Sequence, residues 1–212
     1  KQTVRVERAV NYSLRITLLL SIPISGIFTM FSTRLGLMIY HSEEVGFLIG
    51  ALAPIMPFMY LESVVDGLLK GLDQQVSSLK YSMLDSVLRI AAIVLILPGR
   101  GIKGFLFIMI VSNILTASLN IHRLLAVTRV RMQWAQWILK PLLAIAASGV
   151  AVMGLQRLTE RYSLPMPVFV VLLSLAMLLF YAVLLFLFGC ISKADFRWAR
   201  PVKLRATSRV NR

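Results

Sequence analysis

Six long apolar windows constrain the fold of this chain more than any other feature of its sequence. A helix of about 20 mainly apolar residues crosses the roughly 30 Å hydrocarbon core of a bilayer. The six windows lie near residues 14–40, 46–69, 80–98, 104–126, 138–156 and 166–190. We therefore predict an all-α, polytopic membrane protein with six transmembrane helices.

The balance of residue types supports a membrane protein. Hydrophobic residues make up 58% of the chain and charged residues only 15%, which is far more apolar than a soluble domain. A net charge of +14 would suggest a nucleic-acid partner in a soluble protein. Here the basic residues lie in the gaps between apolar windows, where they are typical topology signals that face anionic lipid. No nucleic-acid partner is predicted.

Lysine and arginine are divided unevenly between the two predicted sides of the membrane. Of the 23 basic residues, 17 fall on the side of the two chain ends, four fall on the opposite side, and Arg34 and Arg89 lie within windows. Because positively charged loops stay in the cytoplasm, both ends of the chain are predicted to be cytoplasmic. Trp134 and Trp137, in the longest internal loop, are interpreted as anchors at the membrane interface.

Proline, glycine and polar residues indicate where the helices bend or end. Pro23 in the first window, and Pro54 and Pro57 in the second, each remove a helix hydrogen bond, so bends are expected there. Turns are expected at Glu43–Glu44, Lys70–Lys80 and Pro98–Gly104.

Four ionisable residues flank the turn between the second and third windows. Glu62 and Asp66 are spaced at i,i+4 and share one helix face, as do Asp85 and Arg89. At about 1.5 Å per residue, Glu62 and Arg89 lie at similar depths of roughly 12 and 13–14 Å from the turn. We expect these two side chains to pair or to reach a shared polar pocket.

Buried charges are costly in a bilayer and usually face a protein interior or a water-filled cavity. This group is interpreted either as an ion-pair network that holds two helices in register, or as the wall of a cavity for an anionic headgroup or a coupling cation. The candidate residues of a substrate or ion pathway are Arg34, Glu62, Asp66, Asp85 and Arg89. Arg34 either extends outward toward Glu43 or Glu44 or offers its planar fork to a phosphate.

The fourth window is unusually polar. Asn113, Thr116 and Asn120 recur at spacings of three and four and form one stripe, with Ser112 and His122 nearby. Hydrogen bonding between helices is the preferred interpretation.

Sequence motifs for enzymes are absent. The chain has no His-Glu-x-x-His motif, Gly-x-Ser-x-Gly motif or phosphate-binding glycine loop. A transport or scaffold role is therefore favoured over catalysis, and no cofactor or metal is predicted. The single cysteine, Cys190, excludes an internal disulfide. It is expected to be a buried thiol, and juxtamembrane palmitoylation is the alternative.

Three short segments carry a resemblance to a known family: Ser21–Gly26, Leu68–Gln75 and Pro98–Gly104. Together they resemble the stage V sporulation protein B group, a polysaccharide-biosynthesis branch of the multidrug/oligosaccharidyl-lipid/polysaccharide exporter superfamily. The resemblance covers about residues 5–190. It implies a larger two-lobed helical transporter of about fourteen spans with its cavity between the lobes.

On that template the chain is expected to be the carboxy-terminal part of a longer protein. Residues 1–126 are similar to the last four helices of the second lobe, and residues 127–190 to a cytoplasmic loop with two terminal transmembrane helices. Residues 191–212 form a basic cytoplasmic tail. The missing amino-terminal part is then a partner of this chain, together with membrane lipids.

The resemblance implies a flippase of the bacterial plasma membrane that exports a lipid-linked saccharide, a precursor of the cell wall or spore wall, by alternating access. Two alternatives remain. One is a multidrug or cation exporter of the same superfamily. The other is a non-transporting membrane scaffold for cell-wall synthesis, which would depend on the basic tail and not on the buried charges.

Overall fold

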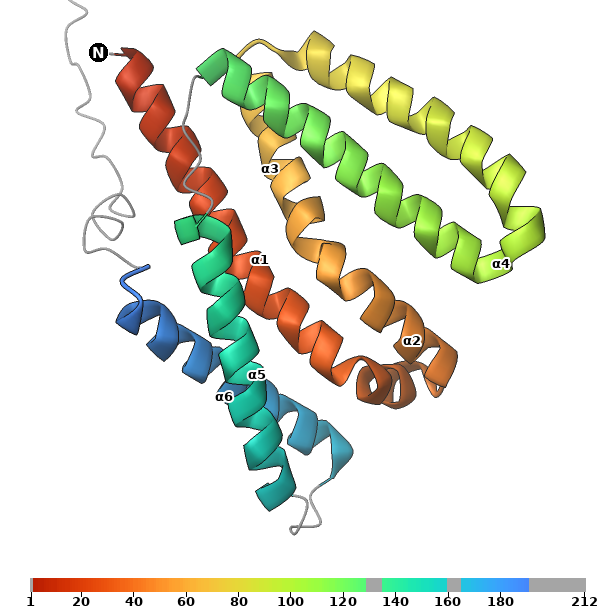
Figure 1. Cartoon of the computed structure of the whole chain (residues 1–212), viewed down its shortest axis with the longest axis vertical. Helices are drawn as coiled ribbons and strands as arrows, with labels where there is room; N and C mark the ends of the chain where they lie inside the picture. Colours follow the sequence, from red (N-terminus) through yellow and green to blue (C-terminus); the bar gives the residue numbers. More distant parts are fainter. Residues whose placement is uncertain (1, 129–134, 160–164, 191–212) are drawn as a thin grey trace, which may run out of the picture.

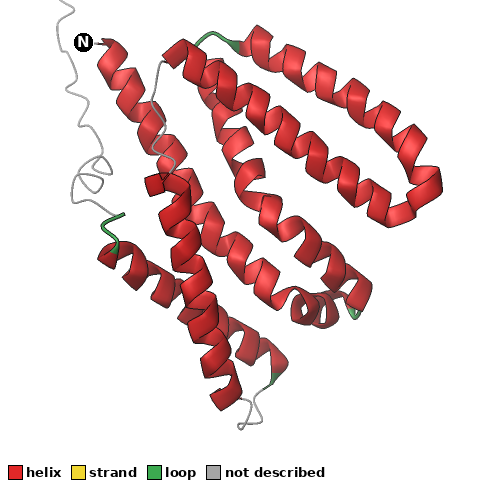
Figure 2. Cartoon of the chain, in the orientation of Figure 1, coloured by secondary structure: helices red, strands yellow, loops and turns green. Residues whose placement is uncertain are grey.

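The computed structural model describes residues 2–128, 135–159 and 165–190. Every element in these ranges is helical, and no strand occurs in them (Figure 2). The elements are α1 (Gln2–Tyr40), α2 (Glu43–Leu52), the 3-10 turn η1 (Ala53–Ile55), α3 (Met56–Gly71), α4 (Gln75–Thr128), the π-helical turn η2 (Ala135–Leu139), α5 (Lys140–Thr159) and α6 (Met166–Leu187). The predicted all-α class is confirmed.

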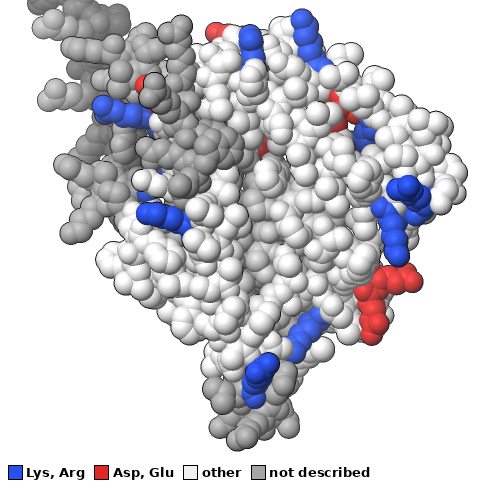
Figure 3. Space-filling view, viewed as in Figure 1, with Lys and Arg blue, Asp and Glu red and all other residues white. Residues whose placement is uncertain are grey.

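Five helical segments are long and apolar enough to cross a membrane. They are Val6–Tyr40, Glu43–Gly71, Gln75–Thr128, Gln136–Arg157 and Met166–Leu187. Uncharged surface covers the middle of the face seen in Figure 3, and charged side chains lie mainly near its margins. These features mark the chain as a membrane-embedded protein.

Helix α4 is folded back on itself at Gly101. This residue has φ 54° and ψ −142°, a conformation that is accessible to glycine because it lacks a Cβ. The first limb (residues 75–100) and the second limb (residues 102–128) therefore run antiparallel (Figure 1). The break lies inside the predicted turn Pro98–Gly104.

Helix α1 is the central helix of the molecule. It packs against α2 and α3 and against α5 and α6, whereas the α4 hairpin packs mainly on α3 (Figure 1). One face of α1 is buried at i,i+4 intervals, as expected for a helix that packs along its length. This face consists of Val10, Leu14, Leu18 and Ile22.

Hydroxyl groups from other helices compensate for two prolines. Pro23 has no N–H for the carbonyl of Leu19, and the hydroxyl of Tyr181 in α6 donates to that carbonyl at 3.0 Å. Helix α1 continues through Pro23 without a break. Pro57 likewise has no N–H for the carbonyl of Ala53, and the Ser25 hydroxyl of α1 donates to it at 2.7 Å.

The expected bend in the second window is present as η1, which separates α2 from α3. The expected turn at Glu43–Glu44 is wrong by two residues. His41, with φ 54°, makes the turn, and Ser42 caps α2 by accepting a hydrogen bond from the Val45 N–H at 3.4 Å. Glu43 and Glu44 instead occupy the first turn of α2, where acids are stabilised by the positive end of the helix dipole.

The turn between α3 and α4 is shorter than the predicted Lys70–Lys80 range. Asp73 has φ 57°, and the Gln74 N–H donates to the Leu69 carbonyl at 2.9 Å, which closes a Schellman-type helix end. Helix α4 begins directly afterwards at Gln75.

The two remaining local predictions have different outcomes. Trp137 is buried in the core and is not an exposed anchor, and Trp134 lies outside the described residues, as does the tail at residues 191–212. Cys190 is a buried free thiol, as predicted.

Candidate functional site within the helices

Asp66 and Lys70 lie near the turn that joins α3 to α4. Asp66 accepts a hydrogen bond from Ser78 of the first limb of α4 and pairs with Lys70 at 2.7 Å between Oδ2 and Nζ. The Lys70 side chain is 60% exposed, so the ion pair itself contributes little to stability. The Ser78 hydrogen bond joins α3 to the first limb of α4 at this end.

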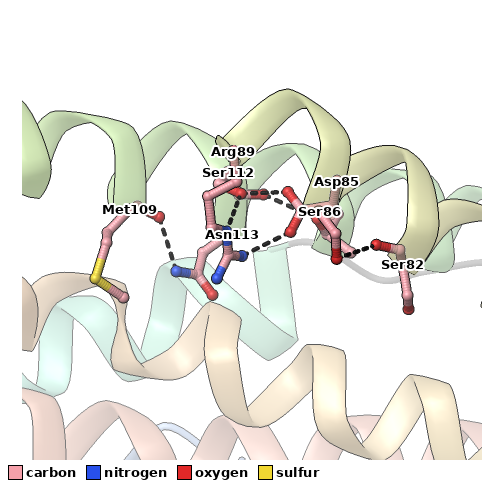
Figure 4. A network of polar contacts seen from close by, with 8 residues as sticks. Ser82, Asp85, Ser86, Arg89, Met109, Ser112 and Asn113 are labelled. Carbon is pink, nitrogen blue, oxygen red and sulfur yellow. Dashed lines mark hydrogen bonds and ion pairs between the residues drawn. The ribbon is translucent and has the colours of Figure 1, made fainter. Parts of the chain in front are cut away.

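A triangle of polar side chains joins the two limbs of α4 (Figure 4). Arg89 Nη2 lies 2.7 Å from Asp85 Oδ2, Arg89 Nε donates to Ser112 Oγ at 2.9 Å, and Ser112 donates to Asp85 Oδ1. Asp85 and Arg89 come from the first limb and Ser112 from the second. Both carboxylate oxygens of Asp85 therefore have partners, which is the condition under which a buried charge is tolerated.

Glu62 is the acid of this group that lacks a direct partner. It is half-buried and close enough to Asp85, Arg89 and Asp66 to interact with their charges. Among the described residues, it takes part in no hydrogen bond or ion pair. The expected ion pair between Glu62 and Arg89 is thus replaced by the pair with Asp85, which lies one turn away on the same helix.

The polar stripe of the second limb is buried, but most of it bonds to its own helix. Asn113 Nδ2 donates to the Met109 carbonyl at 2.7 Å, and the Thr116 hydroxyl donates to the Ser112 carbonyl at 3.0 Å. The Asn120 side-chain oxygen is buried and has no partner among the described residues. The expected hydrogen bond between limbs is made by Ser112 alone of these residues.

Arg34 belongs to a different cluster. Its guanidinium lies over the ring of Phe169 in α6, with 4.6 Å between Cζ and the ring centroid, a cation–π geometry. With its amide oxygen turned toward α1, Gln156 of α5 accepts hydrogen bonds from the same guanidinium, one of them at 3.1 Å. Arg34 therefore turns toward α5 and α6, and not outward toward Glu43 or Glu44 as one expectation had it.

A cavity of about 940 Å³ lies between α1, α3, the second limb of α4 and α5. Its described lining is almost entirely apolar and contains no Asp, Glu, Lys or Arg. None of the five predicted pathway residues is among the lining residues. The walls of this cavity come from helices that are distant in the chain, so the sequence does not predict its shape. The prolines of the second window, Pro54 and Pro57, are local signals that do fall on its lining.

Comparison with protein-family models, with curated proteins and with solved structures finds no match for this chain. The resemblance to the sporulation and polysaccharide flippases therefore remains a prediction that rests on its motifs.

Proposed function

We propose that this chain is part of a membrane transporter that moves a lipid-linked saccharide outward by alternating access. The motifs described above supply the substrate class. The structural observation that supports transport is the triangle of Asp85, Arg89 and Ser112 between two apolar helix limbs. Ionisable residues at such positions are expensive and commonly mark substrate or ion pathways.

In this proposal each limb of α4 crosses the membrane once. Together with α1, the α2–α3 segment, α5 and α6, this makes six crossings. Both ends of the chain then lie on one side of the membrane, and the excess of lysine and arginine on that side supports a cytoplasmic location.

Alternating access needs an element with two discrete arrangements. The α3–α4 hairpin, which consists of α3 and the two limbs of α4, has the parts of such an element. Glu62 of α3 offers a second carboxylate near Arg89 of the first limb. We propose that Arg89 exchanges Asp85 for Glu62 when the first limb of α4 moves along α3. The Arg89 guanidinium is then paired with a carboxylate in both arrangements, so neither arrangement is destabilised by an isolated buried charge.

A complementation assay tests this function. The transporter that carries this chain is expressed in cells depleted of their lipid II flippase, and outward appearance of lipid II is followed for the wild type, Glu62→Gln and Arg89→Gln. We expect rescue by the wild type and loss in both variants at equal membrane abundance. The matched control is Arg100→Gln, which removes an exposed arginine at the break in α4 and should rescue fully. Rescue by all variants would show that the charges of Glu62 and Arg89 are not needed for transport and have a structural role.

A cation or drug exporter is the second candidate, and Glu62 is the observation that favours it. The hairpin holds three acids and two cations within this group, so one carboxylate is available for a cationic substrate or a coupling proton. Failure of lipid II rescue by the wild type, together with Glu62-dependent resistance to a cationic dye, would select the exporter.

A further inference from the structure

The ionisable residues of the α3–α4 hairpin contain one acid more than they contain cations. Arg89 pairs with Asp85 and Lys70 pairs with Asp66, whereas Glu62 takes part in no hydrogen bond or ion pair among the described residues. With all three acids ionised, the group would carry one uncompensated negative charge between apolar helices. Such a charge is costly where water is scarce, and one bound proton would remove it.

Glu62 and Asp85 lie at similar depths in the hairpin. The hydrogen bond between Ser78 and Asp66 fixes the register of the first limb of α4 against α3. Because these two helices run antiparallel from a short turn, Glu62 lies level with Ser82, and Asp85 lies less than one turn beyond. Side chains tilt toward the N-terminus of their own helix, so Glu62 and Asp85 tilt toward each other along the hairpin.

The charged side chains that act on Glu62 come from both helices. They are Asp66 of α3 and Asp85 and Arg89 of the first limb. Arg89 is the cation among them, and it is engaged with Asp85. The charge state of Glu62 is therefore linked to the choice of partner that Arg89 makes.

The two carboxylate oxygens of Asp85 have different partners. Oδ1 accepts a hydrogen bond from Ser112 of the second limb, and Oδ2 lies 2.7 Å from Arg89 Nη2 (Figure 4). When Arg89 leaves Asp85 for Glu62, Oδ2 loses its cation and Glu62 gains one. Asp85 is then the acid that needs a proton, and Glu62 is the acid that can release one.

We propose that the hairpin holds one proton, which lies on Glu62 while Arg89 pairs with Asp85 and on Asp85 Oδ2 while Arg89 pairs with Glu62. In the step between the two arrangements, an O–H bond of the Glu62 carboxyl breaks, one forms at Asp85 Oδ2, and the Arg89 guanidinium moves the opposite way. The group is neutral in both arrangements, so neither contains an uncompensated buried charge. The inference rests on the proposed function, because it uses the exchange of partners by Arg89.

A metal cation is the other ligand that would balance Glu62, and the available oxygen atoms decide against it. Ca²⁺ and Mg²⁺ take about six oxygen ligands or more. Both oxygens of Asp66 and both of Asp85 already bond to other side chains, and the described part of the chain holds no group of three acidic, histidine or cysteine side chains placed for a metal ion. A proton needs one carboxylate oxygen only.

The proton is measured by infrared spectroscopy of the protein in lipid nanodiscs at neutral pH, because a protonated carboxyl has a C=O stretching band that an ionised carboxylate lacks. Isotope-labelled glutamate shifts this band if it belongs to a glutamate. We expect a wild-type band that shifts with the label and is lost in Glu62→Gln. The matched control is Glu43→Gln, which removes an exposed glutamate at the start of α2 and should keep the band.

Asp85→Asn tests the link between the two acids without changing Glu62. Arg89 then has Glu62 as its remaining carboxylate in the group, so Glu62 should ionise and the band should be lost although the glutamate is still present. Asp73→Asn is the matched control, because it removes an exposed aspartate of the turn and should leave the band unchanged. If Asp85→Asn is not monodisperse, Arg89→Gln replaces it and should add a second protonated carboxyl, which does not shift with labelled glutamate.

Four results would overturn the proposal. They are a wild type without a glutamate band, a band that persists in Glu62→Gln, a band that Asp85→Asn leaves unchanged or to which Arg89→Gln adds nothing, and a band that sodium abolishes at constant pH, since a metal cation would then be the ligand. None of these readouts depends on lipid II transport. The expected bands in a protein that fails the complementation assay would keep the proton and reject the saccharide substrate, whereas rescue without the bands would keep the transporter and reject the proton.

Discussion

The α3–α4 hairpin and the core around α1 satisfy buried polar groups in two different ways. In the hairpin the polar groups are charged side chains. They pair with one another within one helix, and serines of the facing helix, Ser78 and Ser112, donate hydrogen bonds to the two aspartates. In the α1 core the polar groups are backbone carbonyls released by prolines, and single hydroxyls of Tyr181 and Ser25 bond to them. The hairpin holds one carboxylate, Glu62, that could serve as a second partner for Arg89. In the core, the Leu19 carbonyl has a single donor, Tyr181, which replaces the missing N–H of Pro23. We therefore propose that the hairpin is the part that moves and that the α1 core stays rigid.

The largest effect on stability is expected from breaking the polar triangle. Asp85→Ala leaves Arg89 partly buried without its carboxylate, since the two side chains are 11% and 36% exposed. We expect a loss of about 3 kcal/mol in the free energy of unfolding, measured by thermal or detergent-induced unfolding of the purified protein. The control is Lys70→Gln, which removes an exposed ion pair and should cost less than about 1 kcal/mol. Equal effects of the two variants would contradict the burial argument.

A smaller loss is expected where α1 and α2 approach most closely. A Cβ on Gly36 would lie 2.3 Å from the backbone nitrogen of Gly46, so Gly36→Ala must push two helix backbones apart. We expect a cost of about 1–3 kcal/mol in the same unfolding measurement. Gly67→Ala is the matched control, because nothing lies within 4 Å of its Cβ position, and helix propensity should make it neutral or stabilising. A neutral Gly36→Ala would mean that α2 is free to shift, which would weaken the contrast between a rigid core and a movable hairpin.

Removing one hydroxyl at a proline should cost less again. Tyr181→Phe leaves the Leu19 carbonyl without its donor at 3.0 Å, and we expect a loss of about 1 kcal/mol. Ser25→Ala should cost less than Tyr181→Phe, because the Ala53 carbonyl still accepts the Met56 N–H. The two variants are compared by thermal unfolding under the same conditions. The reverse order would show that the two carbonyls are not compensated as described.

The smallest effect on stability is expected at Glu62. Because this carboxylate forms no hydrogen bond or ion pair among the described residues, Glu62→Gln should change the free energy of unfolding by less than about 0.5 kcal/mol. Transport should nevertheless be lost if Arg89 exchanges its partner. A Glu62→Gln variant that unfolds like the wild type and still transports would exclude the exchange of partners in the hairpin.

The sequence by itself determined which segments form apolar helices and where several of them end. These are local properties, because length, apolar composition and the position of residues such as Pro54, Pro57 and Gly101 act within one or two helical turns. The error at Glu43–Glu44 has the same local origin. Two adjacent acids favour a turn by composition, but the preceding Ser42 caps a helix that begins at the first of them.

The partners of the buried polar groups were decided only by the tertiary structure. Arg89 and Ser112 are 23 residues apart, and Tyr181 and the Leu19 carbonyl are 162 residues apart, so no local pattern specifies either contact. Glu62 and Arg89 lie at equal depth, which made them expected partners. Arg89 pairs instead with Asp85, because the two residues are one turn apart on the same helix and can meet however the helices pack. The cavity depends on packing even more strongly, because residues from several helices that are distant in the chain line it.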